Sequence, residues 1–118
     1  MAIAWGDLSQ DSGPSWTVTR TYTTSADMTT AGALTVAPTS GQKIVLDDII
    51  ISTDTAMLFE IEMETAETVL AAVRLPANGT VQLTPRDGLK GITADKKLFG
   101  DASAAGNVYI TCCYHSEA

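Results

Sequence analysis

The chain has 118 residues, a hydrophobic fraction of 45% and a formal net charge of −7 at pH 7. This length and this hydrophobicity predict one compact domain with its own core and exclude a disordered chain. The seven Lys and Arg residues argue against a nucleic-acid partner, because phosphate contacts need clustered basic side chains. No stretch approaches the roughly 18 apolar residues of a membrane span, so we expect no membrane partner.

Residues 1–14 differ in pattern from the rest of the chain. Ile3, Trp5 and Leu8 are spaced by small and polar residues, and a run of turn-forming residues follows up to Pro14. The pattern is typical either of an extended arm that reaches a neighbouring molecule or of a terminal segment folded back on its own domain. Burying an aromatic ring contributes about 1.5–3 kcal/mol, so Trp5 should be buried in either case. The segment lacks the basic and long apolar regions of a secretion signal.

The remaining chain, residues 15–118, is expected to form a single β-sandwich domain. β-branched residues are abundant, and Pro and Gly recur between the apolar runs. Residues 17–23 alternate strictly, which places Val18, Arg20 and Tyr22 on one face of a strand. Further strands are expected at residues 33–37, 43–52, 57–64, 68–75, 81–84, 89–92, 97–99 and 108–115. Turns are expected at residues 39–42, 76–79 and 85–88, and a loop at residues 100–107.

Eight or nine short strands without a helix of useful length favour an all-β fold. We predict two packed antiparallel sheets, a β-sandwich of jelly-roll type with an extended N-terminal arm. An up-and-down barrel is the alternative.

Residue types that carry chemistry are scarce. The chain has one histidine, His115, and two adjacent cysteines, Cys112 and Cys113. Because catalytic and metal sites need several such groups at one point, we expect no catalytic residues, no cofactor and no metal. A disulfide between neighbouring cysteines is strained, so both thiols should be reduced, as in a chain made in a cytoplasm. A thiol enzyme using Cys113 and His115, which alternate on one face, is a minor alternative.

Glu60, Glu62 and Glu64 recur at period two, with apolar residues between them. A strand places these three carboxylates on one face. They could form a cation site or an acidic docking stripe, with Glu67 nearby, or simply the solvent face of an amphipathic strand. We favour the solvent face, because calcium usually draws also on loop and carbonyl oxygens.

Asp47 and Asp48 interrupt an apolar run that continues on both sides of them. At least one of the two carboxylates should therefore lie near a buried environment, where it needs a cation or several hydrogen bonds. Either a β-bulge turns both side chains toward solvent, or Arg20, Arg74 or Arg86 forms an ion pair with one of them. A subunit interface over this strand is a further alternative.

Aromatic residues offer a second kind of surface. Trp5, Trp16, Tyr22, Tyr109 and Tyr114 could stack on sugar rings, although most of them should be core or interface residues.

Four segments together resemble small structural proteins of tailed bacteriophages, in particular capsid decoration (cement) proteins built on a jelly roll. They are residues 43–53 (KIVLDDIIIST), 75–83 (LPANGTVQL), 88–94 (GLKGITA) and 105–115 (AGNVYITCCYH). The resemblance implies a non-enzymatic protein of the virion surface, made in the host cytoplasm, that binds an assembled capsid shell and stabilises it. Its expected partners are the major capsid protein and neighbouring copies of itself, in a homotrimer.

The expected partner contacts are Ile3, Trp5 and Leu8 in the arm, together with Asp47 and Asp48. The alternative function is a tail or fibre-tip β-sandwich module that binds a host glycan or receptor through exposed aromatic residues.

Overall fold

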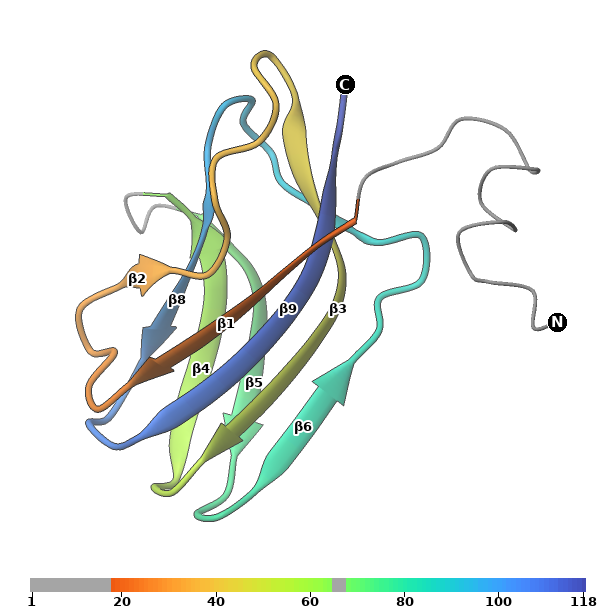
Figure 1. The fold of residues 1–118 in the computed structure, drawn as a ribbon. Helices are drawn as coiled ribbons and strands as arrows, with labels where there is room; N and C mark the ends of the chain where they lie inside the picture. The colour runs from red at the N-terminus through yellow and green to blue at the C-terminus, as the bar shows by residue number, and fades with distance from the viewer. Residues whose placement is uncertain (1–17, 65–67) are drawn as a thin grey trace, which may run out of the picture.

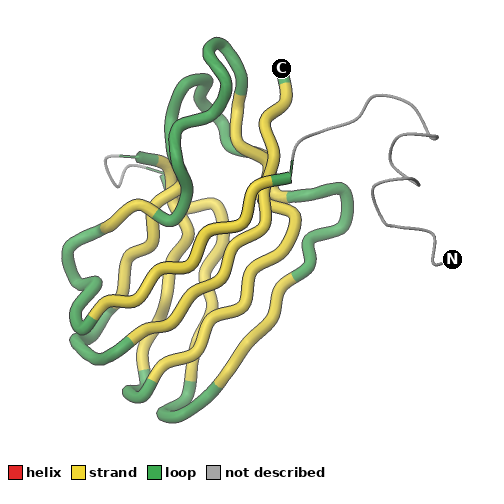
Figure 2. Tube along the Cα trace, in the orientation of Figure 1, coloured by secondary structure: helices red, strands yellow, loops and turns green. Residues whose placement is uncertain are grey.

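A computed structural model describes residues 18–64 and 68–118. Within these ranges the protein is all-β, with two antiparallel sheets packed face to face and no helix (Figures 1 and 2). The predicted β-sandwich is therefore confirmed. The predicted arm, residues 1–14, lies outside the described residues, and so do its proposed contacts Ile3, Trp5 and Leu8.

The two sheets are built from strands that are far apart in the sequence. The strands are β1 (Thr19–Ser25), β2 (Gly32–Ala33), β3 (Lys43–Thr53), β4 (Met57–Met63), β5 (Val69–Leu75), β6 (Thr80–Leu83), β7 (Leu89–Lys90), β8 (Leu98–Ala102) and β9 (Val108–Glu117). The front sheet, nearer the viewer in Figure 1, has the order β1-β9-β3-β6, with β7 paired to β3. The back sheet has the order β2-β8-β4-β5.

The strand pairs are nested along the chain. β1 pairs with β9, β2 with β8, β3 with β6 and β4 with β5, each antiparallel. The pairs β3–β9 and β4–β8 then join these hairpin-like ladders into the two sheets. An up-and-down barrel would pair each strand with the next along the chain, so this order excludes that alternative.

The core lies between the sheets and is filled by the inward residues of both. Phe59, Ile61, Ile49 and Ile51 are each 0% exposed. Burial alternates in β4 from Met57 to Ile61, because Phe59 and Ile61 point into the core while Leu58 and Glu60 are only partly covered. The local pattern therefore determines which face of each strand is buried.

The predicted turns form through local backbone geometry. The Gly79 amide donates to the Pro76 carbonyl at 3.0 Å, and the Gly88 amide donates to the Pro85 carbonyl at 3.1 Å. Asn78 has a φ of 58°, a left-handed conformation that Asn tolerates better than most residues. These two turns are confirmed.

The predicted loop at residues 100–107 begins too early, because β8 continues to Ala102. Gly100 faces Ile61 across the ladder, and a Cβ built on it would lie 2.5 Å from the Phe59 ring. Small residues here make room for the Phe59 ring beneath a strand, although in the sequence they resemble a loop. The second predicted strand is also shorter than expected, since only Gly32 and Ala33 pair with β8.

Candidate functional site

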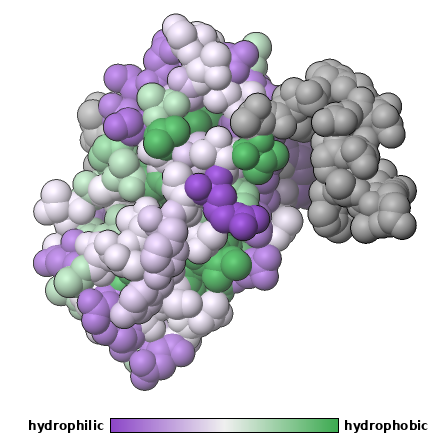
Figure 3. Space-filling view, viewed as in Figure 1, coloured by the Kyte–Doolittle hydropathy of each residue, from purple (hydrophilic) through white to green (hydrophobic). Residues whose placement is uncertain are grey.

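The outer side of the front sheet, here called the front face, is a mixed surface of tyrosine, hydroxyl, isoleucine and a few charged or amide side chains. Its outward side chains are Arg20, Tyr22 and Thr24 on β1, Tyr109, Thr111 and Cys113 on β9, Asp48, Ile50 and Ser52 on β3, and Thr80 and Gln82 on β6. The view in Figure 3 is pale over much of its area, with separate hydrophobic patches and a strongly hydrophilic patch near the centre. Such a mixed surface can bind a partner through shape and aromatic contacts.

Two tyrosines dominate this face. Tyr22 is 66% exposed and Tyr109 is 43% exposed. Tyr22 pairs with Thr111 and Thr24 pairs with Tyr109, so the two tyrosines are diagonal neighbours on adjacent strands. They are close enough for one ligand or partner to contact both.

The other aromatic candidates do not join this surface. Tyr114 is buried, and its hydroxyl accepts a hydrogen bond from the Val36 amide at 3.0 Å. It ties the segment after β2 to the front sheet and is a core residue. Trp5 and Trp16 lie outside the described residues.

A β-bulge separates Asp47 from Asp48. The pairing of β3 with β9 shifts between Leu46 and Asp48, so Asp47 is the extra residue. Asp48 lies on the front face, where its carboxylate accepts hydrogen bonds from Thr84 Oγ1 at 2.9 Å and Gln82 Nε2 at 3.3 Å. The predicted bulge is therefore confirmed.

An arginine partner was the alternative to the bulge, and it is not the arrangement found. Within the described ranges, no arginine nitrogen lies within 4.0 Å of Asp47 or Asp48. The strand is also not covered on both faces along its whole length, since Ile50 is 37% exposed on the front face. Val45, before the bulge, is buried and contacts the turn at Gly88.

Asp47 belongs to a cluster around the single histidine. Its Oδ2 lies 2.7 Å from Nδ1 of His115, and Oε2 of Glu117 lies 2.6 Å from Nε2. The His115 side chain is 4% exposed. Glu117 is two residues away on the same strand, whereas Asp47 is 68 residues away and reaches the ring through the bulge.

Burial opposes the charged imidazole, but the hydrogen bonds to Asp47 and Glu117 outweigh it and raise the pKa of His115 above 6.5. The hydrogen bond from His115 lowers the pKa of Glu117. The two carboxylates therefore favour the charged imidazole more than water does.

The same contacts bear on the thiol-enzyme alternative. Cys113 lies on the face of β9 that also carries His115, as predicted, but both ring nitrogens of His115 are bonded to carboxylates. The ring is therefore not placed to take a proton from the thiol. Burial raises the pKa of the Cys112 thiol to about 12, which leaves it protonated at neutral pH.

A second acidic cluster lies on the outer side of the back sheet. One carboxylate oxygen from each of Glu60, Glu62 and Asp101 lies within 4.8 Å of the others. Burial, together with the neighbouring carboxylates of Asp101 and Glu60, raises the pKa of Glu62. Glu64 is separate, because its Oε1 accepts the Lys97 amide at 2.9 Å. Of the three predicted glutamates, Glu60 and Glu62 belong to the cluster and Glu64 does not. The sequence did not indicate Asp101, because it lies on another strand.

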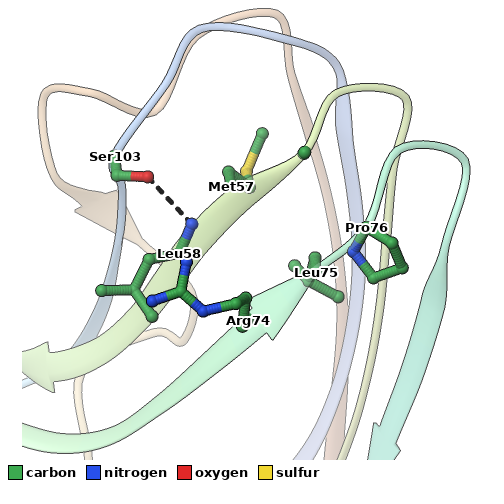
Figure 4. Close-up of a pocket in the computed structure, with 7 residues that line it drawn as sticks. Met57, Leu58, Arg74, Leu75, Pro76 and Ser103 are labelled. Carbon is green, nitrogen blue, oxygen red and sulfur yellow. Dashed lines mark hydrogen bonds between the residues drawn. The ribbon is translucent and has the colours of Figure 1, made fainter.

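A shallow hollow of about 490 Å³ opens at one end of the sandwich, between the start of β4 and the end of β5 (Figure 4). Apolar atoms of Met57, Leu58, Leu75 and Pro76 line most of it. The Leu58 amide donates to Ser103 Oγ at 2.8 Å at its rim. A specific ligand site needs several polar groups that point at the bound molecule, and this hollow has few of them.

Comparison with known proteins adds no relative. A scan against protein-family models finds no match, and a search of curated proteins finds none either. No helix among the described residues is long and apolar enough to cross a membrane. Functional assignment therefore depends on the surfaces and clusters described above.

Proposed function

We propose that the protein is a non-enzymatic structural protein of a phage virion, a capsid decoration subunit that binds the assembled shell and stabilises it. The front face is the observation that carries this proposal. It exposes Tyr22, Ile50 and Tyr109 among short hydroxyl side chains. Tyrosine and arginine are enriched at protein interfaces, and Arg20 lies on the same face of β1 as Tyr22.

The proposal includes a jelly-roll topology. Nested pairing of the first strand with the last, as in β1 with β9 and β2 with β8, is what rolling one long hairpin into two sheets produces. Jelly rolls built from two Greek keys are common in viral capsid proteins. Two of the segments that resemble decoration proteins, residues 43–53 and 105–115, fall on β3 and β9 at the centre of the front sheet.

The size of the front face suggests how such a protein would act. Four strands about 4.8 Å apart and about seven residues long cover roughly 450 Å² in projection. A stable interface usually buries about 800 Å² on each partner. One face alone therefore supports a moderate contact, and a homotrimer with further contacts to the major capsid protein would gain from high effective concentration. Many such contacts over a lattice stabilise a shell without any chemistry.

The front face is tested by the double variant Tyr22→Ala/Tyr109→Ala. Its matched control is Val36→Ala/Ile92→Ala, which removes two exposed apolar side chains outside the strands. We expect the unmodified chain and the control to co-sediment with shells of the phage that encodes the protein. The tyrosine variant should bind about tenfold more weakly or worse, as interface hot-spot residues do. Equal binding by all three would contradict a role for this face.

The arm is tested separately by deleting residues 1–14. Light scattering on a sizing column should show a trimer for the full chain, and the shortened chain should fail to attach to shells. Unchanged attachment would remove Ile3, Trp5 and Leu8 from the proposed contacts.

A second function draws on the same two exposed tyrosines. Diagonal rings on a flat sheet could bind a glycan, as in a tail or fibre-tip module. Saturable binding on a glycan array, lost in Tyr109→Ala, together with no binding to shells, would favour this function over decoration.

A further inference from the structure

The acidic cluster on the back sheet combines charges that ought to repel each other. Glu60 on β4 pairs directly with Asp101 on β8, and Glu62 follows two residues along β4. Like charges directly opposite each other destabilise a sheet. Within the described part of the chain, no Lys or Arg nitrogen lies within 4.0 Å of these carboxylates.

Glu62 supplies a second and independent observation. The residue is only 3% exposed, although it lies on the outer side of its sheet. Its cross-strand neighbours are Phe99 and Val69, which offer no hydrogen-bond donor from their side chains. Its Oε1 is buried and has no hydrogen-bond partner among residues 18–64 and 68–118. A buried carboxylate oxygen without a partner is costly, and a bound cation would satisfy it.

We propose that Glu60, Glu62 and Asp101 bind a divalent cation, Ca²⁺, on the outer face of the back sheet. Carboxylate oxygens are the ligands of hard cations, so zinc and copper are not favoured here. One oxygen from each of the three carboxylates lies within 4.8 Å of the others, close enough for all three to bind one ion. Ca²⁺ tolerates irregular coordination, whereas Mg²⁺ demands near-ideal octahedral geometry and keeps most of its water, so three carboxylates from two strands suit Ca²⁺ better.

Calcium at this position would join β4 to β8 and neutralise the pair of opposed carboxylates. Three protein ligands leave several positions for water, so we expect modest affinity, with a Kd on the order of 10⁻⁴ to 10⁻³ M. This proposal differs from the expectation of no metal that was drawn from the sequence. The third ligand, Asp101, lies on β8 beside β4, so the sequence of β4 alone could not indicate it.

The test is calcium titration by isothermal calorimetry on the full chain after removal of metals with EDTA, together with thermal unfolding with and without Ca²⁺. Asp101→Asn and Glu60→Gln each remove one ligand charge and keep the side-chain size. The control Asp87→Asn changes the net charge equally at an exposed turn, where its φ of 63° suits Asn.

We expect one Ca²⁺ per chain and a rise in unfolding temperature on adding it. Each ligand variant should weaken binding by about tenfold or more, while the control stays within about twofold. In EDTA the ligand variants should unfold at or above the temperature of the unmodified chain, because repulsion is relieved. Loss of binding therefore cannot be ascribed to loss of folding.

Three results would overturn the proposal. One is no saturable heat and no change in unfolding temperature up to about 10 mM Ca²⁺, beyond the range of protein calcium sites. Another is an equal loss of binding in Asp87→Asn, which would indicate general charge attraction. The third is tighter binding of Mg²⁺ than of Ca²⁺.

Discussion

Changing Asp47 to Asn should reduce stability at acid pH and have little effect at alkaline pH. In the protonated state of His115, both ring nitrogens donate, one to Asp47 at 2.7 Å and one to Glu117 at 2.6 Å. The neutral ring has a single N–H, so one of the two carboxylates then faces a lone pair. The cluster therefore stabilises the fold most strongly while the ring is charged.

The direction of the pH dependence follows from the shifted pKa values. Burial alone would lower the pKa of His115, but the hydrogen bonds to Asp47 and Glu117 raise it above 6.5. The folded state thus holds this proton more tightly, and its contribution is complete below pH 6.5 and is lost as pH rises through the folded pKa. The pKa of Glu117 is lowered from 4.5, chiefly by its hydrogen bond with His115, so its contribution is lost as pH falls through that lower value. The cluster is most stabilising between about pH 4.5 and pH 6.5.

The size of the effect is limited by solvent. A hydrogen bond to a charged group contributes about 1.5–3 kcal/mol when well shielded. The Asp47 side chain is 35% exposed, so water screens part of that interaction. We expect Asp47→Asn to lower the free energy of unfolding by about 1 kcal/mol near pH 6, and by much less near pH 9.

The assay is urea unfolding at the two pH values, with Asp87→Asn as the control for a changed net charge. Because the chain has one histidine, an NMR titration of the imidazole reports His115 without ambiguity. A midpoint at or below 6.5 would refute the reasoning. So would a difference between Asp47→Asn and the unmodified chain that grows as pH rises.

Three further predictions concern the core and the thiols. Phe59→Ala, at a side chain that is 0% exposed, should lower the free energy of unfolding by about 3–5 kcal/mol in urea denaturation; a loss below about 1 kcal/mol would mean that the site is not enclosed. Gly100→Ala should cost about 1–3 kcal/mol by the same measurement, since the added Cβ would lie 2.5 Å from the Phe59 ring, and an unchanged stability would contradict that contact. In the folded protein Ellman's reagent should modify Cys113 first and Cys112 only on unfolding, because Cys112 is buried with a pKa of about 12; equal rates would refute this order.

The faces of the strands and the positions of the turns could be predicted from the sequence alone. In β1, Arg20 and Tyr22 are exposed while Thr21 and Thr23 are half-buried, as strict alternation requires. The turns at Pro76–Gly79 and Pro85–Gly88 depend on residues that tolerate a left-handed backbone. Both features are local, because side chains alternate with a period of two and φ is restricted residue by residue.

Strand partners and register were decided only by the tertiary structure. Asp47 reaches His115 because one extra residue bulges out of β3, and Asp101 reaches Glu60 because β8 lies beside β4. Neither contact has a local signal, since the paired strands are separated by long stretches of chain. From the sequence, Gly100 suggests a loop, but the structure shows that a glycine is needed there because the Phe59 ring lies against it. Register and strand order depend on packing between distant segments, so the two clusters assembled from different strands required the folded structure.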